Sequence, residues 1–251
     1  MAELRAVVHP EHVVADPRRE HWMGRVYMRR VSIHLTRLLS TTRVTPDELT
    51  WGMVISGLAA ALLMTVPSPW ATLGAVLLVQ LQVLFDCSDG ELARWRGRGG
   101  PRGVFIDRLG HYTTDSFLVA AVGVHADGGL GSIGGWTTLG LAAAVLVLVS
   151  RAETDLVHVA RAYKDMPMWE PTAARPRTGG IRRLRSLAYR VPINRLLLAW
   201  DLSVVLVGVA VVDAIDGSVR ADQVLAVVLA IVGVLVVLLH LLTILTSDRL
   251  R

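Results

Sequence analysis

Long apolar segments, separated by short polar connections, fill most of the chain after residue 50. A helix needs about 20 predominantly apolar residues to cross the hydrocarbon core of a membrane. The first two segments are short for this task, which implies a tilted helix or a locally thinned membrane. We predict six membrane-spanning helices, at about 51–67, 70–85, 104–124, 136–157, 194–214 and 222–246.

The chain before residue 50 is polar and rich in arginine. We expect residues 1–21 to form an N-terminal tail. Between residues 22 and 40, apolar residues alternate with arginines, as in a basic helix that lies in the membrane interface. An ordinary solvated helix is the alternative. Residues 41–251 would form one domain, so the predicted fold is all-α and integral to the membrane, with six transmembrane helices preceded by an amphipathic interfacial helix.

The start of the first span has a recognisable capping pattern, "TPDEL". Thr45 can cap a helix, Pro46 suits its first turn, and Glu48 stands three residues after Thr45, as in a capping box. We therefore expect a helix to begin at Pro46.

Composition and charge agree with a membrane protein. Hydrophobic residues make up 53% of the chain, which is high for a soluble protein. Of the 26 Lys and Arg residues, only Arg220 falls in the connections that would lie outside the cell, which places both termini in the cytoplasm. The net charge of +5 is therefore attributed to topology and to attraction of anionic membrane lipids, and no nucleic acid partner is expected. Cys87 is the sole cysteine, so no disulfide can form within the chain.

One connection is far more charged than its surroundings, "FDCSDGELARWRGRGGPRGVFIDRLGH". On a helix, one face would present Asp86, Asp89, Gly90, Ala93 and Arg94. The two small residues would leave a groove beside the backbone. The arginine could hold a phosphate with its forked donors.

The following span repeats the pattern, because Asp107, His111 and Asp115 are four residues apart. Two helices could thus bring carboxylates together at the cytoplasmic boundary, where their mutual repulsion calls for cations. Oxygen ligands of this kind suit Mg²⁺ or Mn²⁺. The alternative is that these charges only mark the membrane boundary, with the glycines serving helix packing.

The whole pattern resembles that of the CDP-alcohol phosphotransferase family, D-x2-D-G-x2-A-R-x8-G-x3-D-x3-D. The eighth position differs, because His111 replaces the last Asp. The segment "TPDELT" also resembles the family's "TPN-x-x-T" entry to its first membrane helix, with Asp47 in place of Asn. The matching positions are Asp86, Asp89, Gly90, Ala93, Arg94, Gly103 and Asp107.

The resemblance implies transfer of a phospho-alcohol group from a CDP-alcohol to an acceptor hydroxyl, with release of CMP. Two Mg²⁺ or Mn²⁺ ions would be held by Asp86, Asp89 and Asp107. The donor could be CDP-diacylglycerol, giving a phospholipid, or a polar CDP-alcohol, and the acceptor a polyol or polyol phosphate. A homodimer in the bacterial plasma (inner) membrane is also implied. The nucleotide pocket would be shaped by Gly90, Ala93, Arg94 and Gly103, with Pro46 and Asp47 at its edge.

The substitution at His111 leaves several hypotheses open. The imidazole could act as the general base, since its reference pKa of about 6.5 suits proton transfer near neutral pH. It could instead be a metal ligand that favours Mn²⁺. The base could have moved to Asp115, or activity could be lost, leaving a relative that only binds CDP or lipid. A membrane prenyltransferase is a further alternative.

Two other polar residues lie within predicted spans. Asp201 and His240 could line the same cavity or form a hydrogen bond between helices.

Overall fold

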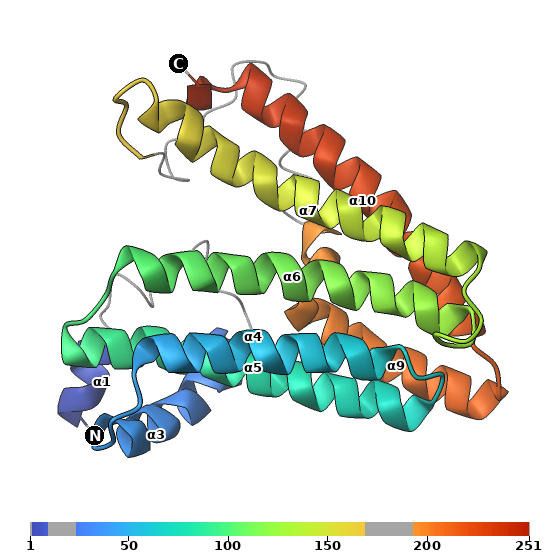
Figure 1. The fold of residues 1–251 in the computed structure, drawn as a ribbon, viewed down its shortest axis with the longest axis horizontal. Helices are drawn as coiled ribbons and strands as arrows, with labels where there is room; N and C mark the ends of the chain where they lie inside the picture. Colours follow the sequence, from blue (N-terminus) through green and yellow to red (C-terminus); the bar gives the residue numbers. More distant parts are fainter. Residues whose placement is uncertain (1, 10–23, 169–192, 251) are drawn as a thin grey trace.

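The computed structural model describes residues 2–9, 24–168 and 193–250, and every regular element within them is helical (Figure 1). Two short elements and one helix precede the main bundle: α1 (Ala2–Val8), η1 (Gly24–Met28) and α3 (Arg29–Ser40). The long helices are α4 (Pro46–Met64), α5 (Pro69–Arg96), α6 (Pro101–Ala126), α7 (Gly135–Ala162), α9 (Ala199–Asp216) and α10 (Arg220–Thr246). The short turns η3 (Ile193–Leu197) and η4 (Asp248–Leu250) complete the described chain.

The helix boundaries follow from local signals. The capping box predicted at Thr45 is present, because Glu48 N donates to Thr45 Oγ1 at 3.3 Å and Thr45 N donates to Glu48 Oε2 at 2.7 Å. Helix α5 continues past the predicted end of the second span near residue 85 and includes the charged residues that were expected on one helix face, up to Arg96. It ends at Gly97, whose φ of 61° is left-handed and favours glycine. Half of the charged connection therefore belongs to α5.

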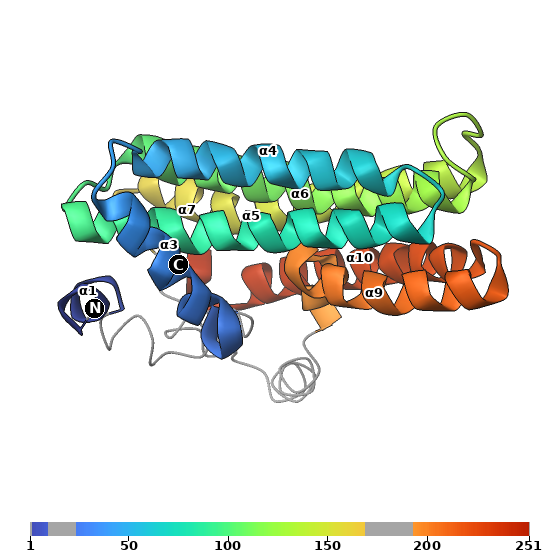
Figure 2. The same cartoon turned by 90° about the horizontal axis from the view of Figure 1, so that it is seen from below.

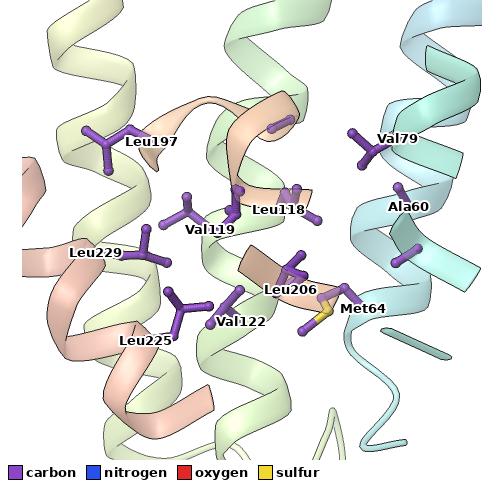
Figure 3. Close-up of a cluster of buried hydrophobic side chains, with 14 of the residues drawn as sticks. Ala60, Met64, Val79, Leu118, Val119, Val122, Leu197, Leu206, Leu225 and Leu229 are labelled. Atoms are coloured by element: carbon purple, nitrogen blue, oxygen red, sulfur yellow. The ribbon is translucent and has the colours of Figure 1, made fainter. Parts of the chain in front are cut away.

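The long helices form two groups. Helix α4 packs against both α5 and α6, whereas α7 and α10 run together at an inclination to them (Figure 1). Helix α9 packs on α5 (Figure 2). One large apolar core joins the two groups, with Leu118, Val119 and Val122 of α6 at its centre (Figure 3). Helix α6 is therefore fixed from both sides.

Four helices of the described chain are long and apolar enough to cross a membrane: α4, α5, α7 and α10. The chain is a membrane protein. Helices α6 and α9 do not meet the same criterion, so the count of six spans stays a prediction. Polar residues account for this in α6, which carries Asp107, His111 and Asp115 along its length. Helix α9 starts at Ala199, later than the predicted 194, because Ile193–Leu197 forms a separate turn.

The N-terminal region is more structured than expected. Within the predicted tail, Ala2–Val8 is helical, whereas residues 10–21 lie outside the described part. Helical structure also covers 24–40 of the predicted interfacial helix, and its buried face carries Ser32, Ile33 and Thr36. That face packs on α5, so this helix is bound to protein on one side. Its placement in the membrane interface stays a prediction.

The end of the bundle away from the charged segment is held by a close helix crossing. A Cβ atom on Gly123 of α6 would lie 2.4 Å from the Trp136 carbonyl oxygen and 2.8 Å from Gly140 Cα. Beside this crossing, Asp127 accepts hydrogen bonds from the backbone N–H groups of Gly134 (2.8 Å) and Thr137 (2.6 Å) at the start of α7. Desolvation acts to raise the pKa of Asp127, but these hydrogen bonds outweigh it and hold the pKa below its usual value.

Candidate metal and nucleotide site

Helices α5 and α6 bring three of the predicted site residues together. Asp86, Asp107 and His111 each offer a ligand atom, and these atoms lie within 4.8 Å of one another. His111 Nε2 is 3.2 Å from Asp86 Oδ1 and 3.5 Å from Asp107 Oδ1. All three side chains are partly exposed, so ions and substrates can reach them. Two carboxylates and an imidazole form a donor set that fits Mn²⁺, and with added water also Mg²⁺.

Asp89 lies outside this group of three. Its Oδ2 accepts a 2.7 Å hydrogen bond from Thr50 Oγ1 of α4, which holds the carboxylate toward α4. The sequence placed Asp89 among the metal ligands on equal terms with Asp86. In the structure, Asp86, Asp107 and His111 form the group that could hold a metal ion, and the role of Asp89 as a ligand stays a prediction.

Both carboxylate oxygens of Asp115 contact groups of other helices. Its side chain is 1% exposed and forms an ion pair with Arg151 of α7. Its other oxygen accepts a 2.8 Å hydrogen bond from the backbone N–H of Ala199, at the start of α9. Both oxygens therefore have partners, and a free carboxylate that could serve as the base is not present here. Asp115 instead fastens α6, α7 and α9 together one turn below His111.

The predicted nucleotide residues lie near the facing ends of α4, α5 and α6. A Cβ atom on Gly90 would be 3.3 Å from Arg94 Nη1, so the exposed guanidinium lies against the glycine. A Cβ on Gly103 would be 3.4 Å from Asp47 Oδ1, and Arg102 Nε lies 3.4 Å from Asp47 Oδ2. The absence of a side chain at Gly90 and Gly103 thus lets the Arg94 guanidinium and the Asp47 carboxylate lie close to the helix backbone.

The two remaining predicted nucleotide residues are on the same helices. Pro46 is the first residue of α4, and its carbonyl accepts a 3.1 Å hydrogen bond from Thr50 Oγ1. Ala93 is half-buried on α5.

Sequence reasoning missed Glu91, which stands between motif positions. Its carboxylate is fully buried and accepts hydrogen bonds from Ser32 Oγ (2.6 Å) and Thr36 Oγ1 (2.7 Å) of α3. His9 Nε2 also lies 2.7 Å from Glu91 Oε1. The four-residue spacing of Ser32 and Thr36 was an available signal for a polar contact. Glu91 therefore ties the N-terminal region to the helix that carries Asp86 and Asp89.

Arg96, at the end of α5, was also missed. Its guanidinium donates to three backbone carbonyls in the connection between α3 and α4: those of Leu39 (2.9 Å), Thr42 (2.8 Å) and Val44. This contact fixes the start of α4 against the end of α5. The turn that carries Pro46 is therefore held next to the predicted site.

Polar contacts between helices account for several residues near the C-terminal end of α7. Asp155 pairs with Arg108 of α6 and accepts a 3.0 Å hydrogen bond from Tyr112 Oη. His240 Nδ1 lies 3.0 Å from Glu153 Oε2 of α7, an ion-pair distance, and the predicted hydrogen bond between helices is not formed by this carboxylate oxygen. Asp201 is half-buried in the first turn of α9.

Comparison with known proteins adds a family and a fold. The family model described as CDP-alcohol phosphatidyltransferase matches residues 43–176. Phosphatidylinositol phosphate synthase (PgsA1) of Mycobacterium tuberculosis with CDP-DAG bound is 22% identical, with 87% of this chain and 96% of that chain covered and a TM-score of 0.53. Its apo form is 20% identical, with 86% and 98% covered and a TM-score of 0.49. No curated protein matches the chain.

The likeness to PgsA1 establishes a shared fold. The family model establishes more, because it spans over half of the chain and includes every motif residue from Pro46 to His111. The chain belongs to the CDP-alcohol phosphatidyltransferase family.

Proposed function

We propose that this protein transfers a phospho-alcohol group from a CDP-alcohol to an acceptor hydroxyl and releases CMP, with a divalent metal centre on α5 and α6. The observation that carries the proposal is the convergence of Asp86, Asp107 and His111 within 4.8 Å, beside a glycine and an arginine suited to a phosphate group. Family membership supports the general transferase activity.

We propose two Mg²⁺ or Mn²⁺ ions, the number that the family resemblance implies. Asp86, Asp107 and His111 would hold them, with Asp89 beside these residues on α5. When bound, such ions neutralise the charge of a pyrophosphate and favour departure of the CMP group. Arg94 supplies further donors for phosphate oxygens, and Gly90 lets the donor approach the helix backbone.

His111 has one nitrogen directed at the carboxylates. Because Nε2 lies 3.2 Å and 3.5 Å from two of them, the geometry favours a metal-ligand role for this nitrogen. A neutral imidazole at the same place could also accept the proton of the acceptor hydroxyl. The two roles predict different effects of removing the imidazole. His111→Ala lowers Mn²⁺ affinity if the residue is a ligand, and lowers kcat about 10²- to 10⁴-fold at saturating metal if it is the base.

The substrates that we propose are CDP-diacylglycerol as donor and a polyol or polyol phosphate as acceptor. A protein of the same fold has been solved with CDP-DAG bound, which supports this donor. In an assay, the purified protein with Mg²⁺ or Mn²⁺ and a panel of CDP-alcohols and acceptors should release CMP. Asp107→Asn should abolish release, whereas Asp127→Asn, at the other end of the bundle, should keep it.

A second candidate is a non-catalytic relative that binds CDP or lipid, and the replacement of the last motif Asp by His111 favours it. Absence of CMP release with every substrate pair, in folded protein that still binds CDP, would support this candidate. Increased turnover in His111→Asp would show that the native residue limits catalysis.

We further propose six spans, with α6 and α9 included, both termini in the cytoplasm of a bacterial cell, and a homodimer. Contacts near the two described ends of the chain support the proposal that both termini lie on the same side of the membrane. Arg161, at the end of α7, donates to the Arg249 carbonyl at 2.8 Å, and the N-terminal helix packs on the end of α5. Labelling of cysteines introduced at Gly99 and Gly131 in a Cys87→Ala background should show that these two positions lie on opposite sides of the membrane. Light scattering in detergent would measure the oligomeric state.

A further inference from the structure

We propose that the N-terminal helix α1 is part of the nucleotide site, where the main-chain carbonyl of Val8 holds the Arg94 guanidinium in the orientation that binds the donor pyrophosphate. This proposal rests on the function proposed above and assigns a positioning role to a segment that precedes the family match at residue 43. Helix α1 packs on α5, near the end of that helix (Figure 1), and shares an apolar cluster with Ile33 of α3.

The central contact joins the backbone of α1 to Arg94. The Nε–H group of Arg94 donates to the Val8 carbonyl oxygen at 2.9 Å. This hydrogen bond uses one of the five N–H donors of the side chain and leaves those of Nη1 and Nη2 for a ligand. Both nitrogens lie over Gly90, because a Cβ atom on that glycine would be 3.3 Å from Nη1 and 3.7 Å from Nη2. The carbonyl thus fixes the donors beside the glycine of the motif.

Apolar packing keeps α1 in place. Leu4 is 6% exposed, and Val8 and Ile33 are fully buried in one cluster, against which Trp95 packs. The residues of α1 between Leu4 and Val8 are exposed, and Val7 is 42% exposed. An isolated helix of seven residues is not stable in water, so α1 forms because it docks on α3 and α5.

A polar contact adds a second attachment one residue beyond the helix. His9 Nε2 lies 2.7 Å from Glu91 Oε1, and the carboxylate is fully buried. The N-terminal segment therefore contacts α5 at Glu91 and at Arg94, which are neighbours on one helix face. Because two contacts and an apolar cluster act together, the Val8 carbonyl is held at a defined place relative to Gly90.

The expected effect is on binding rather than on the chemical step. A free arginine side chain loses rotamer freedom when it binds a phosphate, and prior orientation removes most of that cost. Detachment of α1 should therefore weaken CDP affinity by about three- to tenfold. It should raise the KM for the CDP-alcohol by a similar factor and leave kcat nearly unchanged.

The test compares two aspartates placed on the same helix of the full-length protein. Leu4→Asp places a charge in the cluster and should detach α1, whereas Val7→Asp places the same charge on the exposed face and serves as the matched control. CDP affinity is measured by calorimetry with Mn²⁺ present, and thermal unfolding checks the fold. If Leu4→Asp unfolds the protein, Leu4→Ala gives the same comparison with a smaller expected loss.

The decisive measurement is a double-mutant cycle with Arg94→Ala. If α1 acts through Arg94, Leu4→Asp should weaken CDP binding in the wild type but cause no further loss in the Arg94→Ala background. An equal loss in both backgrounds, or unchanged affinity in the wild-type background, would overturn the proposal. A folded wild-type protein that binds no CDP would overturn the proposed function itself, so the two failures can be told apart.

Discussion

Replacement of Arg151 by Met tests the role assigned to Asp115. The variant removes the positive partner of a carboxylate that is 1% exposed, and leaves it with the single hydrogen bond from the Ala199 N–H group. Met keeps much of the length of the side chain, so packing changes little. The perturbation is thus mainly an unpaired buried charge at the junction of α6, α7 and α9.

The magnitude follows from the burial of the two partners. Breaking a buried ion pair costs about 3–5 kcal/mol. Arg151 is 33% exposed, so water already screens part of the interaction, and we expect a loss of about 2 kcal/mol. For a chain of this size, that corresponds to an apparent melting temperature about 4–8 °C lower.

The assay is thermal unfolding of purified protein in detergent, followed by tryptophan fluorescence. Asp115→Asn in the Arg151→Met background should restore most of the loss, because the amide oxygen still accepts from Ala199 and no charge is left unpaired. An unchanged melting temperature in Arg151→Met would refute the structural role. Loss of CMP release in folded Asp115→Asn would instead support Asp115 as the base.

Three further predictions concern stability. Gly123→Ala should lower the melting temperature, because its Cβ would lie 2.4 Å from the Trp136 carbonyl, whereas the control Gly208→Ala, with no atom within 4 Å, should not; equal melting temperatures would contradict the close crossing. Thr45→Ala should cost about 1 kcal/mol through loss of the helix cap, seen as a lower melting temperature in a thermal scan. Asp127 has a folded pKa below the unfolded value of about 3.9, so its stabilisation is complete above that pH and is lost as pH falls through the folded value. The difference in melting temperature between wild type and Asp127→Asn should therefore shrink below about pH 4, and a difference that grows there would refute the sign.

Local signals in the sequence were sufficient for some elements. The capping box at Thr45 depends on residues three apart, so it could be predicted without knowledge of the fold. The apolar part of α5 ends near residue 85, and the helix continues through the charged residues that were expected on one face until the left-handed Gly97. Charged residues extend a helix as readily as apolar ones when water or protein partners satisfy them.

Contacts between distant segments could not be predicted. The four-residue spacing placed Asp107, His111 and Asp115 on one face of α6, but only the neighbouring helices decide their partners. Asp115 meets Arg151 and the start of α9, while the other two face Asp86. Helix α1 gave no periodic signal because it is seven residues long and is buried only through contacts with α3 and α5.

The contact of Arg96 with the connection between α3 and α4 has a consequence for how the chain can change in length. One guanidinium must reach the carbonyls of Leu39, Thr42 and Val44 at once, so an inserted or deleted residue between 41 and 45 would break the set. The connection between α6 and α7 is fixed at its ends by the hydrogen bonds from Gly134 and Thr137 to Asp127, but its middle is open, because nothing lies within 4 Å of a Cβ on Gly131. Length variation among related sequences should therefore concentrate in the α6–α7 connection, and a tag inserted there should be tolerated.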